Sequence, residues 1–264
     1  MPLRSSWEPS PPAFLINLDE STDRLESATA QFNAAGISFE RVPAFDGRPL
    51  ARAELPDYDI NAALHIMGRR LSGGEIGLCI SHISAMERFL STGAPAGLVF
   101  EDDVSLAPRA SEGITKALEW LARAGIDWDI IHLGPGKHFF YTALHGFDVG
   151  HEAHQIDAAH YFPMGTHGLL WSRAGAAEFL RKHPRIQMPI DNQIQYWQVR
   201  RGRGLSVWPP LARPSGAASI IDGTTTRRDR QDRHPLYGLR KQRRLFTNKA
   251  HALRHKLAAR RPLP

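Results

Sequence analysis

Short apolar runs and amphipathic segments alternate along this chain, and the alternation predicts strands and helices in turn. Apolar or β-branched runs of strand length occupy residues 13–18, 37–45, 97–104, 128–134, 165–172 and 205–209. Apolar positions at helical spacing predict helices over residues 22–36, 72–90, 108–125, 172–183 and 191–201. Because strands and helices alternate, we predict an α/β fold with a mainly parallel sheet flanked by helices.

Helix starts and loops are also readable from the pattern. Ser72 and Glu75 have the spacing of a capping box, which predicts that a helix begins there. Ser172 is expected to cap the helix over residues 172–183. Residues 48–71 and 135–165 show no regular period, so we expect loops, the second of them around a cleft.

Three consecutive carboxylates, Glu101, Asp102 and Asp103, directly follow the apolar run 98–100. The carboxyl ends of buried parallel strands are where α/β proteins bind ligands. Like charges this close raise one another's pKa, and a divalent cation relieves the repulsion. Alternation along a strand places Glu101 and Asp103 on one face, which favours Asp103 as a direct ligand. A solvated acidic turn is the alternative.

Size and composition narrow the possible classes of protein. With 264 residues and 42% hydrophobic residues, the chain can bury a sizeable core. A single cysteine, Cys79, excludes a cysteine-rich zinc site and suits a reducing cytoplasm. We find no apolar run of membrane-spanning length and no secretion signal at the N-terminus, so a cytoplasmic protein is expected.

Charge is unevenly distributed along the chain. Residues 227–264 contain 13 Lys or Arg against two Asp, a net charge of +11. Because the whole chain carries +6, residues 1–226 carry a net charge of −5. We therefore expect a globular domain over 1–226 and a basic C-terminal tail over 227–264. An acidic body speaks against a nucleic-acid-binding fold, so no nucleic acid partner is expected.

Four segments, taken together, resemble glycosyltransferase family 25, which includes bacterial lipopolysaccharide and lipooligosaccharide glycosyltransferases and collagen galactosyltransferases. They are FLINLDESTDR (14–24) with AFDGR (44–48), GGEIGLCISHISAMERF (73–89), LVFEDDV (98–104), and GTHGLLWSRAGAAEFL (165–180) with MPIDNQI (188–194). The resemblance covers about residues 13–215. The chain departs from the family at Leu78, where a cysteine is common, and beyond Pro210, where the match fades.

The resemblance implies a GT-A type fold, a UDP-sugar donor, Mn²⁺ or Mg²⁺, and inversion at the sugar carbon. It implies that Asp103 and Glu101 hold the metal, which bridges the two phosphates of the donor. It also implies a donor site formed by Asn17, Asp19, Arg24, Asp46, Gly47, Ser81, His82 and Asp102.

Most donor-site residues also have a purely structural interpretation. Asn17 and Asp19 would serve as an Asx-type cap of the following helix, with Arg24 on its solvated face. Asp46 and Gly47 form a turn pair. His82 falls in the middle of a predicted helix, where a histidine usually packs in the core.

An inverting transfer needs a base that takes the proton from the acceptor hydroxyl. Asp191 in MPIDNQI is the candidate for this catalytic role, and Asp157 and Glu152 are its substitutes. The alternative is that Asp191 caps its helix. His167 would line the acceptor side, whereas the His-rich segment 151–160 is interpreted as a loop.

The sequence thus predicts an inverting hexosyltransferase that moves galactose or glucose from UDP to a glycan or glycolipid acceptor in lipopolysaccharide or lipooligosaccharide biosynthesis. A nucleotidyltransferase or phosphodiesterase using the same acids is one rival, and a nucleic-acid-binding protein acting through its basic tail is another. Apolar residues among the cations of the tail favour contact with an anionic membrane surface, which would make the enzyme peripheral at the inner face of the cytoplasmic membrane. The alternatives are a solvated tail and a helix that packs on the body through Leu245, Lys249 and Leu253.

Overall fold

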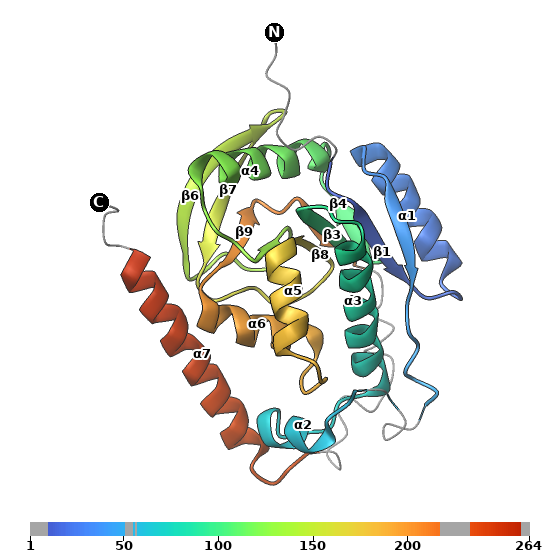
Figure 1. The fold of residues 1–264 in the computed structure, drawn as a ribbon, viewed down its shortest axis with the longest axis vertical. Helices are drawn as coiled ribbons and strands as arrows, with labels where there is room; N and C mark the ends of the chain where they lie inside the picture. The colour runs from blue at the N-terminus through green and yellow to red at the C-terminus, as the bar shows by residue number, and fades with distance from the viewer. Residues whose placement is uncertain (1–9, 51–54, 56, 217–232, 260–264) are drawn as a thin grey trace.

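The computed structural model describes residues 10–50, 55, 57–216 and 233–259 (Figure 1). Its strands are β1 (Ala13–Asn17), β2 (Phe39–Pro43), β3 (Ala96–Glu101), β4 (Val104–Leu106), β5 (Ile130–His132), β6 (Tyr141–Val149), β7 (Glu152–Ala159), β8 (Gly168–Ser172), β9 (Gly204–Trp208) and β10 (Ala212–Pro214). Its helices are α1 (Thr22–Ala35), α2 (Ile60–Ile66), α3 (Gly73–Ser91), α4 (Ala110–Ala124), α5 (Arg173–Lys182), α6 (Ile190–Arg201) and α7 (Tyr237–Ala259).

Eight of these strands form one sheet in the order β2-β1-β3-β8-β5-β9-β7-β6. Strands β2, β1, β3, β5, β9 and β6 run in one direction, and β8 and β7 run in the other. The predicted α/β class, with a mainly parallel sheet flanked by helices, is confirmed. The antiparallel β8 lies between β3 and β5, so its amino end lies beside the acidic end of β3.

Helices cover both faces of this sheet, and each face has its own apolar core (Figure 1). On one face, α3, α5 and α6 pack through Ile76, Phe179 and Ile194. On the other face, α1 and α4 pack through Phe32 and Leu118. Burial of apolar side chains on both faces explains why β3 reads as a continuous apolar run rather than an alternating one.

Several helix ends lie where local sequence signals predicted them. Ser72 and Glu75 form both hydrogen bonds of the capping box at the start of α3. Ser172 accepts a hydrogen bond from the Gly175 amide at the start of α5. Helix α1 ends at Gly36, which has the left-handed conformation that glycine adopts without strain.

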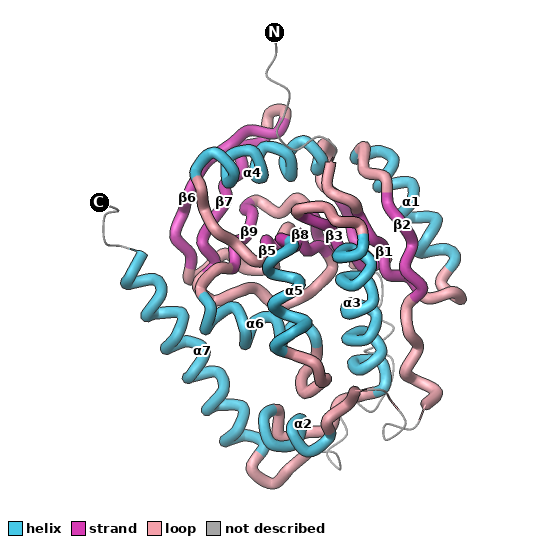
Figure 2. Tube along the Cα trace, in the orientation of Figure 1, coloured by secondary structure: helices cyan, strands magenta, loops and turns pink. Residues whose placement is uncertain are grey.

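The prediction of loops over residues 135–165 was wrong for most of that segment. Strands β6 and β7 form a long antiparallel hairpin at the edge of the sheet, magenta in Figure 2. The His-rich segment 151–160 therefore belongs mainly to a strand and not to a loop. Its alternation is hidden because histidines occupy both exposed and buried positions. The loop expected over residues 48–71 likewise contains a short helix, α2.

Helix α7 lies within the expected basic tail and packs against α6 and α2. Asn248 and Ala252 are its buried residues, and the Arg200 guanidinium on α6 donates a hydrogen bond to the Asn248 side chain. Residues 227–232 and 260–264 of the tail lie outside the described residues, as does the expected domain boundary at residue 226. That boundary stays a prediction.

Candidate active site

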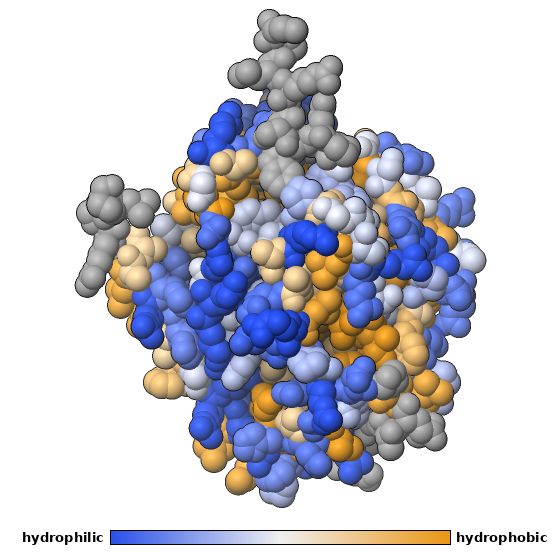
Figure 3. Space-filling view, viewed as in Figure 1, coloured by the Kyte–Doolittle hydropathy of each residue, from blue (hydrophilic) through white to orange (hydrophobic). Residues whose placement is uncertain are grey.

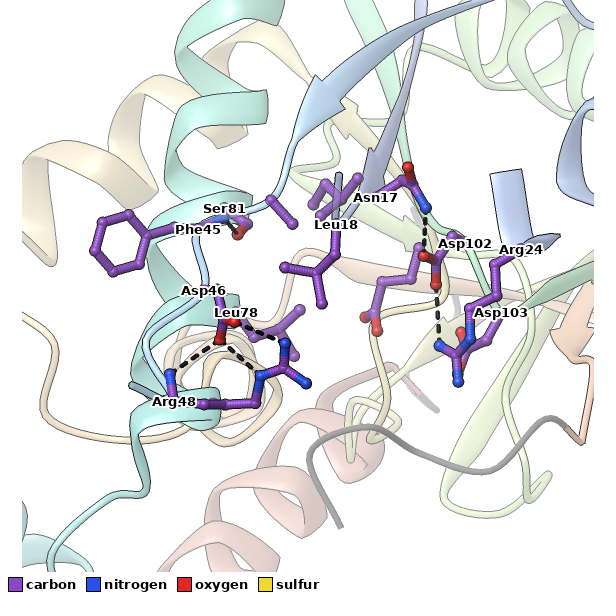
Figure 4. Close-up of a pocket in the computed structure, with 14 residues that line it drawn as sticks. Asn17, Leu18, Arg24, Phe45, Asp46, Arg48, Leu78, Ser81, Asp102 and Asp103 are labelled. Carbon is purple, nitrogen blue, oxygen red and sulfur yellow. Dashed lines mark hydrogen bonds and ion pairs between the residues drawn. The ribbon is translucent and has the colours of Figure 1, made fainter. Parts of the chain in front are cut away.

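A pocket opens where the carboxyl ends of β2, β1 and β3 meet the first turns of α1 and α3 (Figure 4). It brings together residues that are far apart in the sequence. The predicted site residues that line it are Asn17, Arg24, Asp46, Ser81, Glu101, Asp102 and Asp103. The carboxyl edge of parallel strands is the expected place for a ligand in such a fold.

The three acids of this pocket have different partners because β3 ends at Glu101 and a turn follows. The alternation expected from a strand through Asp103 is therefore wrong. Glu101 points into the protein, where it accepts a hydrogen bond from the Thr166 hydroxyl. Its carboxylate also lies 3.3 Å from His82 Nε2. Burial opposes ionisation of Glu101, but these partners hold its pKa below the usual value.

Asp102 is held from two sides (Figure 4). Its carboxylate accepts a hydrogen bond from Asn17 Nδ2 at 2.7 Å, and another from Arg24 Nη1 at 3.2 Å. Asn17 is itself buried at the end of β1 and accepts a hydrogen bond from Arg41 Nε at 2.9 Å. Asn17 and Arg24 therefore fix the position of Asp102, which leaves this carboxylate charge-compensated within the protein.

Asp103 lacks such compensation. Its Oδ1 is buried and has no hydrogen-bond partner in the described part of the chain. Burial raises the pKa of Asp103 to about 6, the neighbouring charges of Glu101 and Asp102 add to this shift, and the charge of Arg24 offsets it only in part. A carboxylate placed at the pocket with an unpartnered oxygen is a poor structural element but a good ligand for a cation.

These residues fit a divalent cation of the kind that binds together with phosphates. Among the described residues, no three His, Cys, Asp or Glu side chains form a ready-made cage for a metal ion. Mg²⁺ commonly takes one or two carboxylates, with substrate phosphates and water completing its shell. Asp103 supplies an oxygen for such a shell, and Glu101 is the adjacent carboxylate. The unpartnered Asp103 oxygen is the observation that favours a cation here.

Asp103→Asn is expected to make the metal-free protein more stable at neutral pH. A folded-state pKa of about 6 lies above the ordinary 3.8, so the ionised carboxylate destabilises the fold fully above pH 6 and not at all below about pH 3.8. A shift of this size corresponds to at most about 3 kcal/mol. Urea unfolding with a chelator present measures the free energy of unfolding of both proteins. The gain of the variant should be largest at pH 7.5 and smaller at the lowest pH where both proteins fold.

The matched control is Asp127→Asn, which removes a carboxylate that is 86% exposed and forms an ion pair with Arg203. It should lack this pH-dependent gain. Equal stability of Asp103→Asn and the parent protein at pH 7.5 would contradict the assignment of Asp103 as an uncompensated charge.

The loop after β2 forms the opposite wall of the pocket. Asp46 accepts hydrogen bonds from the Arg48 amide at 3.0 Å and from Arg48 Nε at 2.7 Å (Figure 4). The side-chain bond from Arg48 holds the pKa of Asp46 below its usual value. Ser81 on α3 accepts a hydrogen bond from the Phe45 amide at 2.8 Å, so it ties this loop to the helix. The Arg48 guanidinium is therefore fixed beside the pocket.

Three predicted donor-site residues, Gly47, Asp19 and His82, do not line the pocket. Gly47 packs so closely on α3 that a Cβ atom would lie 2.3 Å from the Gly73 carbonyl oxygen. Its backbone lets the loop approach the helix, which glycine alone allows. Asp19 is 83% exposed and forms an ion pair with Arg41 at 2.5 Å.

Histidines form a buried layer behind Glu101. His82 is buried on α3 and contacts Glu101, so it orients that carboxylate from within the core. His167 lies beside His132, with ring centroids 5.5 Å apart. Burial lowers the pKa of His132 to about 3 and also lowers that of His167, so both rings are neutral at pH 7.

Comparison with known proteins assigns the chain to a family. The family model described as "Glycosyltransferase family 25 (LPS biosynthesis protein)" matches residues 10–194, well over half of the chain. The chain belongs to glycosyltransferase family 25. The resemblance noted in the sequence is thereby confirmed, and the matched region includes every residue of the pocket.

Curated relatives of this family 25 chain are distant and longer. Procollagen galactosyltransferase 2 of Homo sapiens is 24% identical over 265 residues, which is 89% of this chain and 42% of the relative. The inactive glycosyltransferase 25 family member 3 of Homo sapiens is 33% identical over 192 residues, which is 67% of this chain and 30% of the relative. The chain thus spans less than half the length of these relatives.

One solved structure is similar at a low level. It is a crystal structure of a glycosyltransferase involved in the glycosylation of the major capsid of PBCV-1, with 14% sequence identity and a TM-score of 0.41. The similarity covers 79% of this chain and 93% of that chain.

Asp191 of this family 25 chain lies outside the pocket that holds the acids. It belongs to the first turn of α6, and Pro189, not Asp191, is the N-cap residue, so the capping interpretation is wrong. Cys79 Sγ on α3 lies 3.5 Å from the Met188 carbonyl oxygen, which holds the start of α6 against α3. Asp191 is close enough to Arg244 on α7 to oppose the lowering of the Arg244 pKa by burial.

The two substitutes for Asp191 are less suited to act as a base. Glu152 begins β7, and its side chain is 70% exposed, 3.7 Å from His154. Asp157 is fully buried, and its carboxylate is 2.8 Å from His138 Nε2. Burial raises the pKa of Asp157, with His138 opposing the shift. A conformational change would have to bring the Asp157 carboxylate to the surface before it could contact an acceptor.

Two residues that shape the site were not predicted from the sequence. Arg48 lines the pocket beside Asp46, and Thr166 donates a hydrogen bond to Glu101 across 65 positions of the chain. The Asp46-Gly47-Arg48 turn contained a signal for Arg48, because an Asp side chain in a turn often accepts a hydrogen bond from the backbone amide two positions on. Thr166 carried no such signal, since its contact is purely tertiary.

Proposed function

We propose that this family 25 chain is an inverting, metal-dependent glycosyltransferase that transfers a hexose, galactose or glucose, from a UDP-sugar to a hydroxyl of a glycan or glycolipid acceptor. One observation carries the proposal: a fixed, compensated Asp102 stands next to an uncompensated Asp103 at the carboxyl edge of the sheet. Membership of the family supports sugar transfer as the reaction. The name of the human relative, procollagen galactosyltransferase 2, supports galactose as the sugar.

The donor is proposed to bind in the pocket between the Asp46 loop and the acids. Asn17 and Arg24 hold Asp102 in place, and Arg48 offers a fixed guanidinium to a phosphate oxygen. Asp103, with Glu101 beside it, would hold Mn²⁺ or Mg²⁺. When bound, such an ion acts as a Lewis acid that stabilises negative charge on the departing diphosphate.

Transfer is proposed as one in-line displacement. The acceptor hydroxyl oxygen forms a bond to the sugar carbon while the bond from that carbon to the UDP oxygen breaks, so the configuration inverts. Asp191 accepts the hydroxyl proton, and UDP leaves with the electron pair of the broken bond. Because Asp191 lies outside the pocket of the acids, we place the acceptor at the junction of α3 and α6.

The acceptor and location are proposed from the family description and the charge of the chain. The family model names a lipopolysaccharide biosynthesis protein, which supports a lipopolysaccharide or lipooligosaccharide acceptor. An enzyme on this acceptor would work in the cytoplasm at the inner face of the membrane. Over the described residues, the structure contains no helix with the length and apolar character needed to cross a membrane.

A thermal-shift panel of UDP-sugars, each with and without Mn²⁺, tests donor and metal binding together. A ligand at 100 times its dissociation constant adds about 2.7 kcal/mol to the free energy of unfolding, which suffices to rank donors. We expect one UDP-hexose to stabilise the protein most, and only with the metal. The proposed donor would be contradicted if GDP-sugars or CMP-sugars raised the unfolding temperature of the protein and UDP-sugars did not.

A further inference from the structure

Exposed apolar side chains are concentrated on α7 and the turn before it. Among the described residues, eight large apolar side chains are exposed, and five of them lie between residues 236 and 257. They are Leu236, Leu239, Phe246, Leu253 and Leu257, with exposed fractions from 48% to 76%. Scattered exposed apolar residues are ordinary, but a concentration on one element indicates a contact surface.

The four exposed apolar residues within α7 form one stripe along its outer face. Leu239, Phe246, Leu253 and Leu257 are spaced by seven, seven and four positions, and such spacings bring side chains to one side of a helix. The buried residues of the helix, Asn248 and Ala252, lie on the opposite side, against the body of the protein. The stripe is therefore not needed to hold α7 in place.

Cations border this outer stripe. Helix α7 contains seven Lys or Arg and no Asp or Glu. At 100° per residue, Arg243 and Arg254 fall on one side of the stripe, and Lys249 falls on the other. At the edge of the molecule where α7 lies, Figure 3 shows patches of hydrophobic residues (orange) among hydrophilic ones (blue).

A groove beside the stripe gathers further positive charge. It lies between α2, α6 and α7, and its lining contains no acidic residue; the arginines among its lining residues are Arg200, Arg240, Arg243 and Arg244. Arg244 donates a hydrogen bond to the Ile66 carbonyl at 3.3 Å, and Arg200 to the Tyr196 carbonyl at 2.8 Å, so both guanidiniums are fixed. Asp191 lies near Arg244, but no acidic side chain is among the residues that line the groove, so the groove attracts anions.

We propose that the outer face of α7 rests on an anionic phospholipid membrane, with its apolar stripe at the boundary of headgroups and acyl chains. The cations along the stripe and the arginines of the groove then face the lipid phosphates. An amphipathic helix with aromatic and aliphatic residues on one face and Lys and Arg beside them binds such surfaces. Charge complementarity favours an anionic membrane as the partner. A protein surface without acidic residues would not neutralise these cations, and a second copy of this chain would bring the same cations together. This inference does not depend on the proposed sugar transfer.

Sedimentation of the full chain with liposomes tests this surface at low salt. We expect binding to vesicles of phosphatidylcholine with phosphatidylglycerol, and little binding to phosphatidylcholine alone. The charge variant Arg243→Gln/Lys249→Gln/Arg254→Gln should bind the anionic vesicles about 100-fold more weakly, because each cation near the surface contributes about 1 kcal/mol. The stripe variant Leu239→Ser/Phe246→Ser/Leu253→Ser should also lose binding, without any change in net charge.

The matched control is Arg123→Gln/Arg173→Gln/Lys182→Gln, which removes three exposed cations from α4 and α5. It should bind like the parent protein, and circular dichroism should show the same helix content in all four proteins. Equal losses in the control and the charge variant would reduce the effect to net charge and overturn the proposal. The proposal would also be overturned if the stripe variant bound as well as the parent protein. The same holds if the parent protein did not bind anionic vesicles and instead dimerised through α7.

Discussion

Asp103→Asn is expected to reduce turnover of the UDP-sugar at least 100-fold while leaving the fold intact. The asparagine keeps the shape of the side chain but removes the charge that would attract a cation. Lewis-acid stabilisation of a leaving group is worth several kcal/mol, and each 1.36 kcal/mol corresponds to a factor of ten in rate. Release of UDP in the presence of Mn²⁺ measures the rate, and circular dichroism checks the fold.

Asp127→Asn serves as the control for this experiment as well, because it makes the same chemical change at an exposed carboxylate. Its turnover should match that of the parent protein. Thermal unfolding adds a reading that does not depend on activity: Mn²⁺ with UDP should stabilise the parent protein and not Asp103→Asn. Turnover of the variant at the parental rate would remove Asp103 from the metal site.

Asp191→Asn is expected to slow sugar transfer by a factor between 10² and 10⁴, the range for loss of a general base. Donor binding should be unchanged, because Asp191 does not line the pocket that holds the acids. The asparagine Oδ1 can still accept the hydrogen bond from the Asn192 amide that Asp191 accepts at 2.6 Å. The start of α6 should therefore keep its structure. Steady-state transfer rates and the thermal shift with UDP and Mn²⁺ measure the two effects separately.

Asp157→Asn is the comparison for Asp157, the buried substitute for Asp191 as the base: its transfer rate should stay near that of the parent protein. Because Asp157 is fully buried against His138, its replacement should lower the free energy of unfolding more than the replacement of Asp191 does. If Asp191→Asn loses UDP binding, Asp191 belongs to the donor site. If it transfers sugar at the parental rate, another group takes the proton.

The sequence predicted the elements whose signals are local. The capping box at Ser72 and Glu75, the Ser172 cap and the apolar run before Glu101 depend on neighbours within a few positions, and all three are as predicted. The β6–β7 hairpin was missed because its strands carry histidine and small residues on both faces, which hides the period of two.

The division of labour among the three acids could not be read from the sequence. It is set by partners that are distant in the chain: Asn17 lies 85 positions from Asp102, and Thr166 lies 65 positions from Glu101. Sequence reasoning did select Asp103 as the principal ligand, but from an alternation that the turn after β3 does not follow. The unpartnered oxygen of Asp103 provides a better reason for the same choice.

Product analysis of the reaction tests the central proposal most directly. The parent protein is incubated with a UDP-hexose, Mn²⁺ and a lipooligosaccharide acceptor. The acceptor and nucleotide products are identified by mass spectrometry, and the configuration of the new linkage is determined by NMR. Sugar transfer predicts an acceptor heavier by one hexose residue, an inverted linkage and release of intact UDP. Formation of UMP, or transfer of the nucleotide itself to the acceptor, would contradict the account and support a nucleotidyltransferase or phosphodiesterase that uses the same acids.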